Sequence, residues 1–112
     1  MRSVLSSACL LALVAVAPGL ATAADPAAVA AGKKKAATCA VCHGLDGLSK
    51  NPEAPHLAGD NPEPLIKQLK AFQSGARQND QMSIMAQSLS EEDMRNLAAW
   101  YSSIKVSVEL PQ

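Results

Sequence analysis

Apolar residues recur at helical spacing in three stretches of the chain, and no stretch shows the convincing alternation of a β-strand. The first stretch begins at Asp25 and Pro26, because aspartate is a good N-cap and proline suits the first helical turn. This helix extends to about Thr38. Near the C-terminus, apolar and polar residues alternate only weakly over residues 106–110. The pattern predicts an all-α fold with three main helices joined by loops. The apolar face of the first helix comprises Val29, Gly32, Ala36 and Cys39.

The other two predicted helices have clear start signals. One opens at Asn61, again with an early proline, and ends at Gly75. The last begins at Ser90, which forms a capping box with Asp93, while the flanking Leu89 and Met94 have the spacing of a hydrophobic staple. The glycine- and proline-rich residues 44–60 are predicted to be loop, and residues 76–88 are ambiguous, a loop and a short helical turn. The apolar stripes comprise Leu65, Ile66, Leu69 and Phe72 in one helix, and Met94, Leu97, Ala98, Tyr101 and Ile104 in the other.

The N-terminal segment has the three parts of a secretory signal peptide. Arg2 supplies positive charge, residues 4–16 are mostly apolar, and small residues at 21–23 form a cleavage pattern. The apolar run is shorter than the roughly 20 residues of a membrane-spanning helix. We therefore expect a signal peptide over residues 1–23, one domain over residues 24–112, periplasmic localisation and no stable membrane insertion after cleavage.

Composition limits how the mature domain is stabilised and what it binds. Its aromatic residues are only Phe72, Trp100 and Tyr101, and so small a core commonly needs a metal, a cofactor or a disulfide. The full chain has ten basic and ten acidic residues, and removal of Arg2 with the signal leaves nine basic residues against ten acidic ones, so there is no strong positive field. Nucleic-acid binding is therefore not expected.

Residues 39–43 read Cys-Ala-Val-Cys-His, which is the C-x-x-C-H pattern of covalent haem attachment. Two thiols at this spacing reach the two vinyl groups of a porphyrin, and His43 then lies beneath the iron. A thioredoxin-like motif would need a βαβ context, and zinc would need a further ligand besides His56. A disulfide would not require the histidine. We therefore expect one haem c, attached through Cys39 and Cys42, with His43 as proximal iron ligand.

A second axial ligand is expected in the C-terminal half. His56 lies only about a dozen residues from the attachment site, and Met94 is explained as the staple residue. Met82 and Met85 lie nearly forty residues on, in a predicted loop with polar neighbours, which argues against both being core filler. The residues alone leave the choice between these two methionines open.

The chain resembles the class I cytochromes c of bacteria, both the small monohaem c-553 type and either half of the dihaem type. The resemblance covers nearly the whole mature chain and implies the cytochrome c fold wrapped around one covalent haem. The matching segments are CAVCHGLDG (39–47), PHLAG (55–59), QLKAFQSGARQND (68–80) and LSEEDMRNLAAWYSS (89–103).

The resemblance also implies roles for individual residues. Met82, rather than Met85, matches the distal iron ligand, and the carbonyl of Pro55 matches the acceptor of a hydrogen bond from the proximal histidine. Gly32 matches a close helix contact, here against Leu97 and Trp100. His56 departs from the lysine frequent at its position; an exposed histidine there is expected to be silent, with a pH-sensitive potential as the less favoured alternative.

The leading functional hypothesis is a diffusible, monomeric periplasmic electron carrier that is not an enzyme and docks transiently with redox partners. The alternative is a dedicated electron-accepting subunit of a periplasmic dehydrogenase or oxidase. A third hypothesis, an enzyme or sensor with an open iron site, requires neither methionine to be a ligand. The cluster Lys33, Lys34 and Lys35 is read as a solvated face in preference to a docking patch.

Overall fold

The computed structural model describes residues 23–112, so the predicted signal peptide lies outside the described residues except for Ala23. The described residues form helices and no strand, which confirms the all-α prediction. No helix in this part of the chain has the length and apolar character needed to cross a bilayer. The helices are α1 (Pro26–Lys35), α2 (Ala40–His43), α3 (Pro62–Ser74), α4 (Asp80–Gln87) and α5 (Glu91–Ser103).

The first predicted helix ends earlier than expected, and a second short helix follows it. The α1 helix ends at Lys35, and a turn separates it from α2, which begins after Cys39. Within this turn the Thr38 hydroxyl donates to the Lys35 carbonyl at 3.3 Å, so the polar side chain bonds to the backbone locally. The prediction of one helix to Thr38 was therefore wrong at its C-terminal end.

The ambiguous segment 76–88 contains α4, so Met82 and Met85 lie on a helix and not in the predicted loop. Asn79 starts this helix, because its side chain accepts hydrogen bonds from the backbone N–H groups of Gln81 (3.1 Å) and Met82 (2.9 Å).

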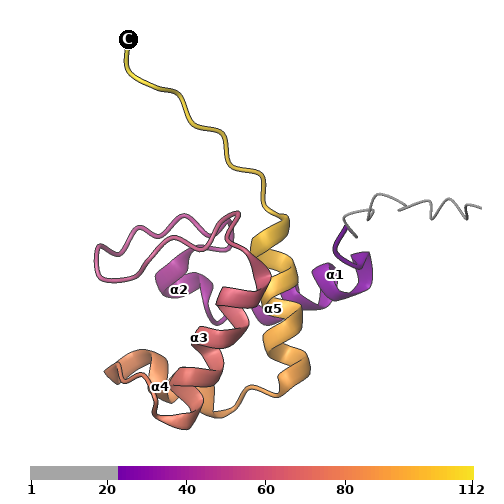
Figure 1. Cartoon of the computed structure of the whole chain (residues 1–112), viewed down its shortest axis with the longest axis vertical. Coiled ribbons are helices and arrows are strands. Elements are labelled where there is room, and N and C mark those ends of the chain that lie inside the picture. The colour runs from indigo at the N-terminus through magenta and orange to yellow at the C-terminus, as the bar shows by residue number, and fades with distance from the viewer. Residues whose placement is uncertain (1–22) are drawn as a thin grey trace, which may run out of the picture.

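At the C-terminus, residues 104–112 leave the body as an extended segment without regular structure (Figure 1).

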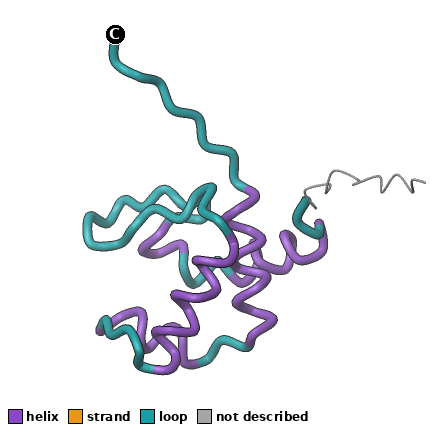
Figure 2. The backbone as a smooth tube through the Cα atoms, viewed as in Figure 1, coloured by secondary structure: helices purple, strands orange, loops and turns teal. Residues whose placement is uncertain are grey.

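The helices α1 and α5 cross in the most extensive contact of the fold, and α3 packs against both α5 and α4 (Figures 1 and 2). Gly32 lies at the crossing. A Cβ at this position would collide with the main chain of Asn96 and lie 2.9 Å from the Cβ of Trp100. The predicted contact with Trp100 is therefore present, but the closest partner is the backbone of Asn96 and not Leu97.

The core between these helices is small. Met94 is the only large side chain that is fully buried in the described residues. The capping box predicted for α5 is confirmed: Ser90 Oγ accepts from Asp93 N–H, and Asp93 Oδ2 accepts from Ser90 N–H, both at 3.0 Å. The buried apolar residues are Ala36, Phe72, Ala86, Met94, Leu97, Ala98 and Tyr101.

Asp93 also joins α5 to α1 through an ion pair with Lys35 at 3.1 Å. The backbone hydrogen bond from Ser90 lowers the pKa of the Asp93 carboxyl, and the bond from Lys35 lowers it further. Since the folded-state pKa lies below that of the unfolded chain, the carboxylate stabilises the fold at neutral pH.

We expect Gly32→Ala to destabilise the holoprotein by about 1–3 kcal/mol, because the added methyl meets backbone that cannot rotate away. Helix propensity alone would give the opposite sign, a gain of about 1 kcal/mol. Denaturant unfolding measures the difference. Ala31→Leu, at the exposed neighbouring position, is the control and should change stability by less than about 0.5 kcal/mol. A stabilised Gly32→Ala protein would contradict the observed helix contact.

We expect Asp93→Asn to lower the free energy of unfolding at pH 7 by a few tenths to about 1 kcal/mol, the usual range for partly exposed ion pairs. In the wild type, the Asp93 carboxylate contributes to the free energy of unfolding above its unfolded-state pKa of about 3.9. This contribution is lost as pH falls through the folded-state pKa. The stabilities of the two proteins should therefore begin to converge below about pH 4 and become equal only below the folded-state pKa of Asp93. Glu92→Gln, at the adjacent exposed position, serves as the control. A gap that stays constant down to acid pH would refute the electrostatic origin.

Candidate haem site

The C-x-x-C-H segment forms the short helix α2 and the residue that precedes it. Cys39 is the N-cap residue of α2, and Cys42 and His43 form its last two positions. The two thiols are free and half-buried, and their spacing of three positions places them on one side of the helix. Burial raises the pKa of the Cys39 thiol, a rise that hydrogen bonding to Thr38 and the charge of Lys35 partly oppose.

His43 is buried, with 7% of its surface exposed, and its ring has a defined orientation. Its Nδ1 atom lies 2.9 Å from the carbonyl oxygen of Pro55. A carbonyl only accepts hydrogen bonds, so Nδ1 carries the proton and Nε2 keeps its lone pair. This contact is the one that the resemblance implied for Pro55, and the resulting tautomer is the one that binds a metal through Nε2.

The loop over residues 44–60 delivers the Pro55 carbonyl because it is closed by its own hydrogen bonds. The carbonyl of Gly47 accepts from the N–H groups of Leu57 (2.8 Å) and Ala58 (3.2 Å), and the Ser49 hydroxyl donates to the Cys42 carbonyl at 2.8 Å. Gly47 has a φ of 71°, and a Cβ there would lie 2.6 Å from the nitrogen of Ala58. The loop therefore closes tightly only with glycine at this position.

His56 is exposed and takes part in this same loop. Its Nδ1 accepts a hydrogen bond from Ser49 N–H at 2.8 Å. The structure thus gives His56 a local hydrogen-bonding role.

Two aromatic residues of α5 hold the other side of the motif. Trp100 Nε1 donates to the carbonyl of Leu45 at 2.9 Å, and the Tyr101 hydroxyl donates to the carbonyl of Gly44 at 3.2 Å. Burial is the main cause that raises the pKa of Tyr101, and the negative charges of the nearby Cys39 and Asp46 raise it further. The phenol therefore stays protonated and remains a hydrogen-bond donor. The sequence marked both aromatics as core or packing residues, and nothing in it indicated these bonds across more than fifty positions.

The two candidate methionines are both half-buried on α4. They are three positions apart and so share one face of the helix, whereas Ile84 between them is 70% exposed. The backbone N–H of Met82 is held by the Asn79 side chain at 2.9 Å. The fold therefore fixes Met82 at the first turn of α4 and Met85 one turn later.

The predicted lysine cluster is divided among different contacts. Lys35 pairs with Asp93, and the Lys33 ammonium lies over the Trp100 ring at 5.4 Å from its centroid. These contacts support a mainly structural role for two of the three lysines.

A groove of about 650 Å³ lies beside α2, and Cys42 is the one predicted site residue that lines it. Neither His43 nor either candidate methionine lines it. Its walls include Val41, Cys42, Leu45 and Trp100, so it is a groove on the outer side of the attachment helix.

The residues present fit a covalently attached haem. Two free thiols, an imidazole with an available Nε2 and thioether sulfurs form a donor set that suits a porphyrin and its iron. Several large apolar side chains pack against the small core and are only partly buried. They are Leu57, Leu65, Leu69 and Ile104.

This helical fold and its thiol–imidazole site define a c-type cytochrome. The chain belongs to the cytochrome c family, since the family model described as Cytochrome c matches residues 29–105. The cofactor of this family is covalently bound haem c with its iron, and Cys39, Cys42 and His43 fit its attachment motif.

The relatives described here differ in how much of their own length this chain covers. The chain is 43% identical to cytochrome c4 of Pseudomonas aeruginosa over 90 residues, which are 80% of this chain and 44% of that protein. It is 43% identical to cytochrome c-554(548) of Halomonas halodenitrificans over 77 residues, which are 66% of this chain and 93% of that protein. A third relative, 45% identical over 75% of this chain and 39% of its own length, is the thiosulfate dehydrogenase electron acceptor of Thiomonas intermedia.

The fold comparison agrees with the sequence relatives. The crystal structure of reduced recombinant cytochrome c4 from Pseudomonas stutzeri matches with a TM-score of 0.66 and 38% identity, over 71% of this chain and 47% of that chain. The chain thus spans about half the length of the cytochrome c4 relatives that it matches.

Proposed function

We propose that the chain is a periplasmic carrier of single electrons whose haem iron is bound by His43 on the proximal side and Met82 on the distal side. The observation that carries this proposal is the orientation of the His43 ring. With Nδ1 directed to Pro55, Nε2 is available to the iron of a porphyrin attached at Cys39 and Cys42.

The bound haem supplies a one-electron iron couple, and the chain's own residues set its environment. The hydrogen bond to Pro55 makes the His43 imidazole a stronger donor and fixes its plane. A thioether ligand favours the reduced iron and raises the potential relative to a second histidine. With both axial positions filled, no substrate reaches the iron, so the protein transfers electrons and is not an enzyme. The signal-peptide pattern of residues 1–23 supports export to the periplasm.

Replacing each methionine in turn tests the distal ligand. We expect Met82→Ala to remove the sulfur-to-iron charge-transfer band of the oxidised protein and to let carbon monoxide bind the reduced protein. The reduction potential should fall by on the order of 0.1 V, within the roughly 0.8 V range that axial ligands span. Met85→Ala, one turn away on the same helix face, is the matched control and should keep the wild-type spectrum.

The opposite pattern between the two variants would assign the distal ligand to Met85. Rapid carbon monoxide binding by the reduced wild-type protein would refute closed ligation altogether and favour an open iron site.

A second candidate function is favoured by the relative named thiosulfate dehydrogenase electron acceptor, which is 45% identical over three quarters of this chain. In this alternative the protein is the dedicated acceptor of one periplasmic dehydrogenase. Stopped-flow measurement of the rate at which a purified thiosulfate dehydrogenase with thiosulfate reduces the oxidised holoprotein distinguishes a dedicated acceptor from a general carrier. A dedicated acceptor should be reduced at least tenfold faster by that enzyme than by unrelated dehydrogenases. Similar rates with all donors would instead support a general carrier.

A further inference from the structure

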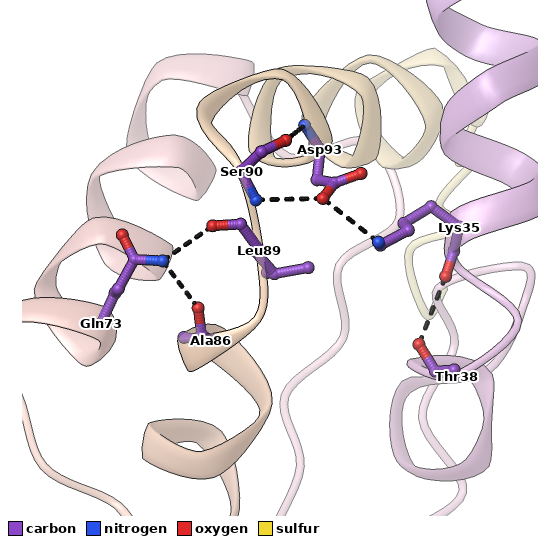
Figure 3. A network of polar contacts seen from close by, with 7 residues as sticks. All are labelled: Lys35, Thr38, Gln73, Ala86, Leu89, Ser90 and Asp93. Atoms are coloured by element: carbon purple, nitrogen blue, oxygen red, sulfur yellow. Dashed lines mark hydrogen bonds and ion pairs between the residues drawn. The ribbon is translucent and has the colours of Figure 1, made fainter.

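One side chain of α3 joins the end of α4 to the segment that leads into α5. Gln73 is half-buried, and its Nε2 donates to the carbonyl oxygens of Ala86 at 2.9 Å and Leu89 at 2.8 Å (Figure 3). A glutamine amide has two N–H donors, and here both are used. The single side chain therefore fixes two points of the backbone that lie three residues apart.

A reciprocal bond strengthens this connection. The Gln87 side chain at the end of α4 donates from Nε2 to the backbone carbonyl of Gln73 at 3.1 Å. Apolar packing of α4 is limited by comparison, since Ala86 is its only buried residue and Ile84 is 70% exposed. The placement of α4 on α3 therefore depends strongly on the glutamine hydrogen bonds.

The same network continues toward the haem-attachment segment. From Leu89 the chain enters the capping box of Ser90 and Asp93, and Asp93 bonds to Lys35 at 3.1 Å (Figure 3). The backbone carbonyl of Lys35 in turn accepts a hydrogen bond from the hydroxyl of Thr38, and Thr38 directly precedes Cys39. A continuous set of polar contacts thus connects the helix of the two methionines with the segment that carries the first thiol.

We propose that Gln73 is a positioning residue for the distal iron ligand: it holds α4 against α3 so that a methionine sulfur stays on the iron. This inference rests on the proposed His/Met ligation, and it applies whether Met82 or Met85 is the ligand, because both lie on α4. Without the two hydrogen bonds, α4 moves away from α3 more often, and the sulfur leaves the iron in that open state.

The test compares variants of the oxidised and reduced holoprotein. Gln73→Leu keeps the approximate size of the side chain and removes both donors. Loss of two hydrogen bonds of ordinary strength should raise the population of the open state about tenfold or more. We expect carbon monoxide to bind the reduced variant about tenfold faster than the wild type, with a weaker sulfur-to-iron charge-transfer band and a lowered reduction potential.

Two further variants separate positioning from general stability. Gln73→Lys retains N–H donors at similar reach and should restore most of the slow carbon monoxide binding and the charge-transfer band. Gln68→Leu is the matched control on the same helix, since Gln68 is exposed and bonds to Arg77 and not to α4. A Gln73→Leu protein with a lower unfolding temperature but wild-type carbon monoxide binding and potential would overturn the proposal. So would equal effects of Gln73→Leu and Gln68→Leu.

If Gln73→Leu yields no folded holoprotein, Gln87→Leu removes the exposed reciprocal bond alone. It should accelerate carbon monoxide binding a few-fold over Gln68→Leu, and equal rates in these two proteins would overturn the proposal. An error in the proposed His/Met ligation would be recognised in the wild-type protein itself. That protein would then lack the sulfur-to-iron charge-transfer band or bind carbon monoxide rapidly, without any change at Gln73.

Discussion

The close approach of α1 and α5 at Gly32 is the contact on which the rest of the structure depends. Only a residue without a Cβ lets the α1 backbone reach the main chain of Asn96. This crossing brings the end of α1, and with it Cys39, to the side of α5 that carries Trp100 and Tyr101. Those two side chains then bind the carbonyls just after the attachment helix, so one helix crossing sets the place of the whole C-x-x-C-H segment.

The chemistry of the site follows from how one loop is closed. The loop over residues 44–60 bonds to itself through the Gly47 carbonyl, and this closure presents the Pro55 carbonyl to His43. A backbone acceptor is suited to this task because it cannot titrate and has no side-chain rotamer to change. With Nδ1 directed to Pro55, Nε2 is the nitrogen available to iron.

The part of the fold that contains α4 is built differently, because this helix has only 8 residues and half of them are polar. The end of α4 is held to α3 by hydrogen bonds of Gln73 and Gln87, of which those from Gln73 are partly buried. The small apolar core gives a reason for this design. With Met94 as the only large fully buried side chain of the described residues, the protein relies on polar contacts and on its covalent cofactor for rigidity.

Local sequence was enough to predict the all-α class, α3, the capping box of α5 and the haem-attachment motif, because caps, turns and C-x-x-C-H act over four or five neighbouring residues. Only the tertiary structure showed that residues 76–88 contain α4 and that Gly32 meets Asn96. It alone revealed Tyr101 bonded to Gly44 and Gln73 bonded across to Leu89. These contacts join residues 16 and 57 positions apart, and such pairs come together only when the helices pack, so no local pattern encodes them.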